Sequence, residues 1–98
     1  MAVTGRTIAF AVHGPIERSD LPGLCDRVCA LFAKTTPEVA YCDVSDVPAD
    51  AVTVDALARL QLAAHRRGSV VHLRNSSPQL RELVALMGLT EVLVEVER

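Results

Sequence analysis

Hydrophobic positions follow a short-range pattern in several segments of the chain. Residues Thr7–His13 form an apolar run closed by Gly14-Pro15, which predicts a buried strand followed by a turn. Similar runs rich in β-forming residues predict strands at 39–44 and 70–73. Residues 92–96 alternate between apolar and acidic side chains, so a last, exposed strand is expected there.

Between these runs the apolar residues recur every three or four positions, which predicts three helices, at about 20–34, 50–67 and 77–87. Each segment begins at a residue suited to an N-cap: Asp20, Asp50 and Ser77. Gly68 and Gly88 suit the ends of the second and third helices, since glycine tolerates a left-handed backbone. Strands and helices therefore alternate along the whole chain.

This alternation is typical of an α/β fold with a largely parallel sheet and right-handed crossovers. A chain of 98 residues can bury one hydrophobic core and cannot divide it, so residues 1–98 are expected to form a single domain. Half of the residues are hydrophobic but only 3% are aromatic, which predicts an aliphatic core.

Charge and hydropathy restrict the classes of partner. The formal net charge is -2 and the pI about 5.8, which argues against nucleic-acid binding. The apolar stretches are far shorter than the roughly 20 residues that span a bilayer, and the first residues lack a signal-peptide core. We therefore expect a cytoplasmic protein without membrane contact.

Enzymatic motifs are missing from the sequence. It contains no glycine-rich phosphate loop, no Gly-x-Ser-x-Gly elbow and no His-Glu-x-x-His zinc motif. Three cysteines without metal-ligand spacing predict free, buried thiols, and a Cys42 nucleophile with His13 or His72 remains only a geometric alternative. We expect no catalytic residues, no metal and no cofactor.

Acidic residues gather around the loop between the second strand and the second helix. They are Asp43, Asp46, Asp50 and Asp55. Two interpretations have equal weight: the carboxylates form turns and cap the helix, or they make an acidic edge that faces a partner. Loops that follow the carboxyl ends of parallel strands gather at one end of a sheet, where partners commonly bind.

Several segments, in their order and spacing, resemble the STAS family, the fold of bacterial anti-sigma factor antagonists. They are V-H-G-P-I-E at 12–17, D-V-S at 43–45, R-R-G at 66–68, and V-V-H-L-R-N-S-S-P-Q-L-R-E-L-V-A-L-M-G-L at 70–89. The resemblance covers about residues 7–89. It implies a mixed, largely parallel four- to five-stranded sheet with helices packed chiefly on one face.

The resemblance also implies a function. Signalling members of the family carry a phosphorylated serine at the start of the second helix, after an aspartate that corresponds to Asp50 here. Ala51 occupies that serine position, so the usual phosphoryl acceptor is absent. Thr53, two residues further on, is an alternative phosphosite, and its other expected role is in the first turn of the helix.

We therefore expect a non-catalytic protein-interaction module for transcription regulation that binds an anti-sigma factor or a related ATPase-fold kinase. The expected partner-binding residues are Ser45, Asp46, Asp50, Ala51, Thr53 and Asp55. The alternative is a sensor of a nucleotide or another small ligand, with Ser76 and Ser77 offering an anion-binding site at the third helix. Shortened ends relative to the family also favour a homodimer.

Overall fold

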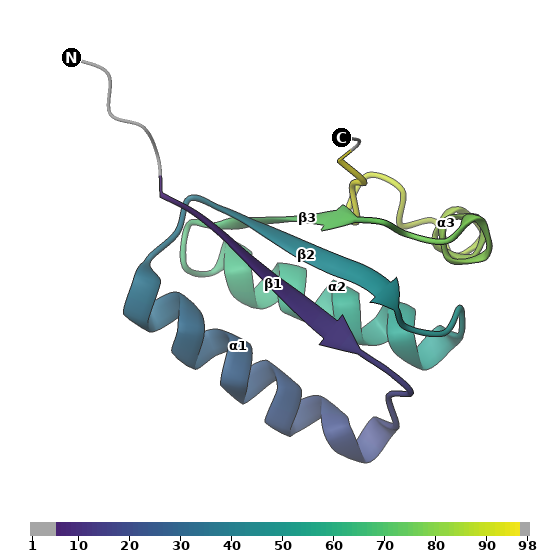
Figure 1. Ribbon diagram of the computed structural model, residues 1–98, viewed down its shortest axis with the longest axis horizontal. Helices are drawn as coiled ribbons and strands as arrows, with labels where there is room; N and C mark the ends of the chain where they lie inside the picture. The colour runs from purple at the N-terminus through teal and green to yellow at the C-terminus, as the bar shows by residue number, and fades with distance from the viewer. Residues whose placement is uncertain (1–5, 97–98) are drawn as a thin grey trace.

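A computed structural model describes residues 6–96 of the chain (Figure 1). Its elements are β1 (Thr7–His13), a short 3-10 turn η1 (Arg18–Asp20), α1 (Leu21–Thr35), β2 (Val39–Asp46), α2 (Ala51–His65), β3 (Val70–Arg74) and α3 (Pro78–Leu86). The strands and helices predicted from hydrophobic periodicity are thus confirmed up to the end of α3, with boundaries that differ by a few residues.

The three strands form one parallel sheet in the order β1-β2-β3. Val39 of β2 lies in register with Thr7 on one side and with Val70 on the other. The register between β1 and β2 shifts between Ala11 and His13. The fold class is confirmed, although the sheet in the described part of the chain has three strands where we expected four to five.

Helices α1 and α2 cover the same face of the sheet, and α3 lies beyond the carboxyl end of β3 (Figure 1). Side chains on the covered face of β2 and β3 are buried with those of α2, among them Leu57, Leu60 and Val44, whereas on β1 only Val12 is buried. Phe32 is the only fully buried aromatic ring of the core among residues 6–96, and its edge meets Phe10. The core is therefore aliphatic, as the composition predicts.

Residues 92–96 do not form the exposed strand that we expected. They contact β3 through a single parallel bridge between Leu73 and Glu95. The amide of Leu73 donates to the carbonyl of Val94 at 2.8 Å, and the amide of Val96 donates to the carbonyl of Leu73 at 2.8 Å. Leu93 is buried in the core rather than exposed, so the chain turns inward where a regular strand would continue along the edge.

The side chain of Gln61 explains why the pairing at this edge is so short. Its Oε1 accepts from the amide of Val71 at 2.8 Å, and its Nε2 donates to the carbonyl of Val71 at 2.8 Å. Nε2 also donates to the carbonyl of Val92 at 2.9 Å. Because an amide side chain already satisfies the outward backbone groups of Val71, no further strand residue has to pair there.

Helix N-termini follow the sequence signals with one correction. The carboxylate of Asp50 accepts from the amide of Thr53 at 2.8 Å, and the hydroxyl of Ser77 accepts from the amide of Leu80 at 3.1 Å, so both expected caps are confirmed. Asp20 does not cap α1, because its carboxylate accepts from the amide of Glu17 at 2.9 Å. The chain enters α1 through the turn η1, which the periodicity did not reveal.

Replacing Gln61 by alanine is expected to destabilise the protein by about 2 to 4 kcal/mol, because the buried amide and carbonyl of Val71 lose their partners. Urea unfolding followed by circular dichroism measures the change. Gln79→Ala, at an exposed position in the first turn of α3, is the control and should cost less than about 0.5 kcal/mol. Equal losses for the two variants would contradict the assigned role of Gln61.

Candidate protein-interaction site

The segment between β2 and α2 carries most of the predicted partner-binding residues at the carboxyl end of the sheet. Ser45 and Asp46 end β2, and Asp50 and Ala51 begin α2. All four are exposed. The structure therefore brings these residues together on one accessible surface, which we call the β2–α2 loop surface.

Packing against the β1–α1 turn fixes the path of this loop. The amide of Gly14 donates to the carbonyl of Asp46 at 3.0 Å. A Cβ at residue 14 would overlap the ring of Pro48 and closely approach the backbone of Val47. Only glycine allows the two segments to approach this closely, and the peptide bond between Gly14 and Pro15 is cis.

Asp43 and Asp46 make internal contacts before the loop begins. The Asp43 carboxylate accepts from the amide of Ser45 at 2.9 Å and from the side-chain amide of Asn75 at 3.0 Å. These hydrogen bonds, first those from Ser45, hold the pKa of Asp43 below its usual value. Asp46 contacts Nδ1 of His13 at 3.0 Å, although 70% of its side chain stays exposed. Asp43 thus shapes the turn, whereas Asp46 remains accessible to a partner.

Asp55 joins α2 to the turn η1. Its carboxylate accepts from Nε of Arg59 at 3.0 Å and from a guanidinium nitrogen of Arg18 at 2.9 Å. The hydrogen bonds from Arg59 and then Arg18 lower the pKa of the Asp55 carboxyl. With 29% of its side chain exposed and both oxygens engaged, Asp55 has less capacity for a partner than Asp46.

The two residues that the phosphorylation argument singled out lie in opposite environments. Ala51, the first residue of α2, is exposed. Thr53 is fully buried in the core, so its hydroxyl is accessible neither to a kinase nor to a partner in this structure. Thr53 lies on the side of α2 that faces the core, next to Val54 and one helical turn before Leu57. This spacing from the apolar residues is the sequence signal that could have predicted its burial.

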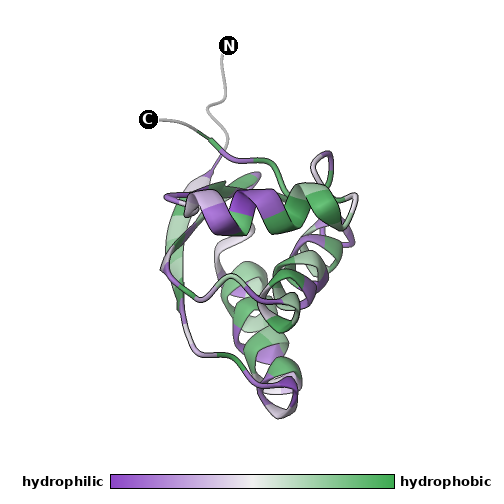
Figure 2. Ribbon diagram, turned by 90° about the vertical axis from the view of Figure 1, so that its right-hand side faces the viewer, coloured by the Kyte–Doolittle hydropathy of each residue, from purple (hydrophilic) through white to green (hydrophobic). Residues whose placement is uncertain are grey.

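An apolar groove next to the loop was not anticipated from the sequence. It has a volume of about 650 Å³ and is lined by Ala49, Gln79, Glu82, Leu83, Ala85 and Leu86. The side chain of Leu86 is 83% exposed, and hydrophobic residues gather at the end of α3 (Figure 2). Leu86 lies outside the apolar stripe that faces the core, and this is the signal that could have identified it.

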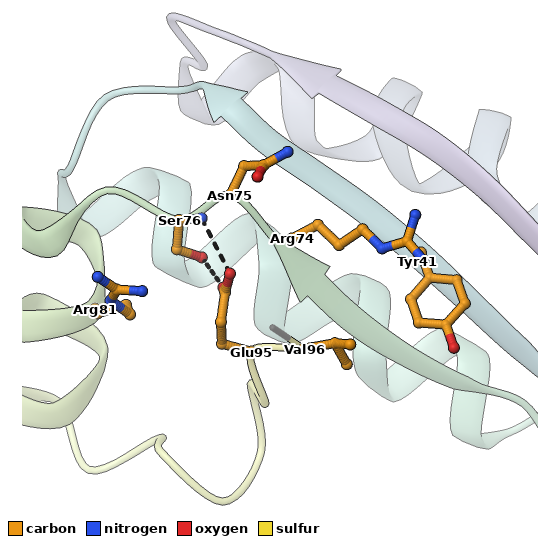
Figure 3. Close-up of a pocket in the computed structure, with 7 residues that line it drawn as sticks. All are labelled: Tyr41, Arg74, Asn75, Ser76, Arg81, Glu95 and Val96. Carbon is orange, nitrogen blue, oxygen red and sulfur yellow. Dashed lines mark hydrogen bonds between the residues drawn. The ribbon is translucent and has the colours of Figure 1, made fainter. Parts of the chain in front are cut away.

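Ser76 and Ser77, the predicted anion-binding residues, are engaged within the chain. The amide and hydroxyl of Ser76 both donate to the carboxylate of Glu95 (Figure 3). The hydroxyl of Ser77 accepts from the first turn of α3. Ser76, but not Ser77, lines a pocket of about 820 Å³ whose lining also includes Arg74 and Arg81. The carboxylate of Glu95 already occupies the position where an anion would meet Ser76.

Cys42 does not pair with His72 or with His13, which is exposed and contacts the Asp46 carboxylate through Nδ1. Cys42 is fully buried on the helix-covered side of β2, and this burial raises the pKa of its thiol to about 12. His72 alternates with buried residues of β3 and therefore points to the opposite side of the sheet, where it contacts Tyr41. The buried-thiol expectation is confirmed for Cys42, whereas Cys25 and Cys29 are half-buried.

Metal-binding groups and membrane-spanning helices are both absent from residues 6–96. This part of the chain holds no group of three or more His, Cys, Asp or Glu side chains positioned for a metal ion. None of its helices combines the length and hydropathy that crossing a membrane requires.

Asp50 serves the fold as a helix cap, and two substitutions separate this role from its charge. Asp50→Ala should lower the free energy of unfolding by about 1 kcal/mol, because the amide of Thr53 loses its acceptor. Asp50→Asn keeps an oxygen in the same place and should cost only a few tenths of that loss. Thermal and urea unfolding measure both. An asparagine variant as unstable as the alanine variant would show that the cap is not what Asp50 contributes.

Comparison with known proteins gives a result for structure and none for sequence. No protein-family model matches the chain, and no curated protein matches it. Among solved structures, the chain is similar to a sulfate transporter family protein from Wolinella succinogenes, with 24% identity and a TM-score of 0.63 over 90% of this chain and 71% of that one.

A second solved structure has a comparable likeness. The anti-sigma factor antagonist SpoIIAA in its unphosphorylated form has 15% identity and a TM-score of 0.62, and the match covers 100% of this chain and 86% of that chain. At these identities the likeness concerns the fold alone. The chain therefore has a STAS-like fold, as the order and spacing of its sequence segments predicted.

Proposed function

We propose that this protein is a non-catalytic interaction module that binds an anti-sigma factor or a related ATPase-fold kinase through the β2–α2 loop surface. The observation that carries the proposal is an exposed acidic loop that packs against the β1–α1 turn. Asp46 and Asp50 are exposed there, while Pro48 packs closely against Gly14 and the amide of Gly14 donates to the carbonyl of Asp46. A loop whose path is fixed by such contacts binds at a lower entropic cost than a flexible loop would.

The apolar groove at α3 extends this surface. Ala49 of the loop and Leu86 of α3 line the same groove, so a partner that covers the loop would also reach the exposed leucine. Large apolar side chains at the centre of an interface contribute much of its binding energy, and a charged rim adds orientation. The complementary partner surface would present basic residues to Asp46 and Asp50 and an apolar side chain to the groove.

Ala51 replaces the serine that is phosphorylated in signalling members of the family, which supports an interaction that is not controlled by phosphorylation at this position. Position 51 lies on the accessible surface, but alanine offers no oxygen for phosphoryl transfer. Thr53 does not replace it, because its hydroxyl is buried. In this proposal phosphorylation at position 51 does not control the complex, and a negative charge introduced there would imitate the missing phosphate.

The test is capture of partners from the native cytosol with the tagged chain, followed by mass spectrometry and by calorimetric titration of the purified partner. We expect an anti-sigma factor or an ATPase-fold kinase, with an affinity that Ala51→Glu reduces by about tenfold or more. Glutamate at the start of α2 agrees with the helix dipole, so the fold should keep its stability. Enrichment of neither class of protein would refute the proposal.

Ala33→Glu is the matched control, because it makes the same chemical change at an exposed position near the end of α1. This variant should bind the partner as tightly as the native chain. If the partner is a kinase, the Ala51→Ser variant should gain one phosphoryl group from ATP when it is incubated with that partner and ATP. The native chain should gain none. Equal weakening by Ala51→Glu and Ala33→Glu would place the interface elsewhere.

A further inference from the structure

The two edges of the sheet differ in how their backbone groups are satisfied. At the β3 edge, Gln61 bonds both outward groups of Val71, and residues 94–96 bond both outward groups of Leu73. At the β1 edge, no segment within residues 6–96 pairs with the strand. Within residues 6–96 the β3 edge is thus closed by particular side-chain and backbone contacts, whereas the β1 edge is open.

Backbone alternation identifies the groups that the β1 edge exposes. The carbonyl of Arg6 accepts from the amides of Glu38 and Val39, at 2.9 and 3.3 Å, so residue 6 faces β2. In a parallel ladder successive residues face opposite sides, and residues 7, 9 and 11 therefore direct both their amides and their carbonyls outward. Thr7, Ala9 and Ala11 are all exposed.

The open edge lacks the charged residues and prolines that often prevent strand pairing. None occurs from Thr7 to Val12, and the only irregularity of the strand is the register shift at its end, between Ala11 and His13. The side chains of Ile8 and Phe10, on the helix-covered side, are only partly buried because no neighbouring strand covers them. An uncharged, partly apolar edge of this kind favours association with another strand.

We propose that β1 pairs with β1 of a second copy of this chain, antiparallel and about a two-fold axis at Phe10, to form a continuous six-stranded sheet. In this register Ala9 lies opposite Ala11 of the second copy, and each pair exchanges two backbone hydrogen bonds. The small side chains of both alanines avoid a clash on the open face. The proposal concerns a surface other than the β2–α2 loop surface and does not rest on the proposed function.

Self-complementarity favours a second copy over an unrelated strand. A two-fold interface uses the same patch on both partners, and the alternating pattern of β1 matches itself when reversed about Phe10. Phe10 faces β2 with its backbone, so it would meet Phe10 of the second copy as a non-hydrogen-bonded pair, in which side chains approach most closely. Cross-strand aromatic pairs of this kind stabilise sheets.

A groove lies beside the edge, between β1 and α1. It has a volume of about 460 Å³, and its lining combines the buried Val12 and the partly buried Leu24 with the charged side chains of Asp20 and Arg27. In the antiparallel register Ile8 of the second copy lies opposite Val12, on the side of the sheet where the groove opens. Pairing would therefore cover the partly exposed side chain of Ile8 in both copies as well as satisfy backbone groups.

Sedimentation equilibrium of the full chain tests the proposal, and we expect twice the 10.5 kDa mass of the monomer. Ala9→Pro removes an outward amide and should reduce the mass to that of one chain, with an unchanged circular dichroism spectrum, since proline is tolerated on strand edges. Ala11→Lys places two like charges in the interface, one on each side of the two-fold axis, and should also reduce the mass to that of one chain. Val70→Lys, a partly exposed position on β3, is the control and should remain dimeric.

Amide hydrogen exchange of the native chain gives a second readout that does not depend on any variant. The amides of Ala9 and Ala11 should be protected at high protein concentration and should exchange rapidly on dilution, while that of Val71 stays protected at both. A native chain that is monomeric at every concentration would overturn the proposal. A dimer in which the Ala9 and Ala11 amides exchange freely would also overturn it, because its interface would lie elsewhere.

Discussion

The amide of Gln61 joins three parts of the chain at one buried point: helix α2, strand β3 and the segment that follows α3. Both of its polar atoms satisfy the buried backbone groups of Val71, which would otherwise lie unpaired at a cost of about 1 to 3 kcal/mol per group. This side chain replaces a length of strand. It allows the chain after β3 to turn inward and bury Leu93 instead of continuing along the edge.

The β2–α2 loop surface depends on a different constraint, which is the close contact between the two loops that follow the carboxyl ends of β1 and β2. Parallel strands bring these ends together, and the capped first turn of α2 holds Asp50 and Ala51 at the surface. The same geometry divides the acidic residues into two groups. Asp43 and Asp55 are engaged by neighbours, as the structural interpretation of the acidic segment predicts, whereas Asp46 stays largely exposed, and its contact with a partner stays a prediction.

Strands, helices and two of three caps could be predicted, because hydrophobic periodicity and capping residues are local properties of the sequence. The predicted cap at Asp20 was wrong, because its carboxylate accepts from the amide of Glu17. Glu17 is the N-cap of η1, and the sequence does not reveal which of the two acidic residues begins a helical turn. The buried position of Thr53 and the exposure of Leu86 are tertiary properties, as each depends on which side of a helix meets the sheet. The last strand was wrong because the role of Gln61 is not visible in a periodic pattern.

The contact between Gly14 and Pro48 has a consequence for the evolution of this fold. Any side chain at position 14 would force the two loops apart and displace the β2–α2 loop surface. Substitutions there should be rejected by selection for the shape of the surface, even where the surrounding sequence drifts freely. A glycine before proline at the end of the first strand, coupled to a proline in the loop after the second, would therefore mark distant homologues that share the same loop conformation when overall identity no longer reveals them.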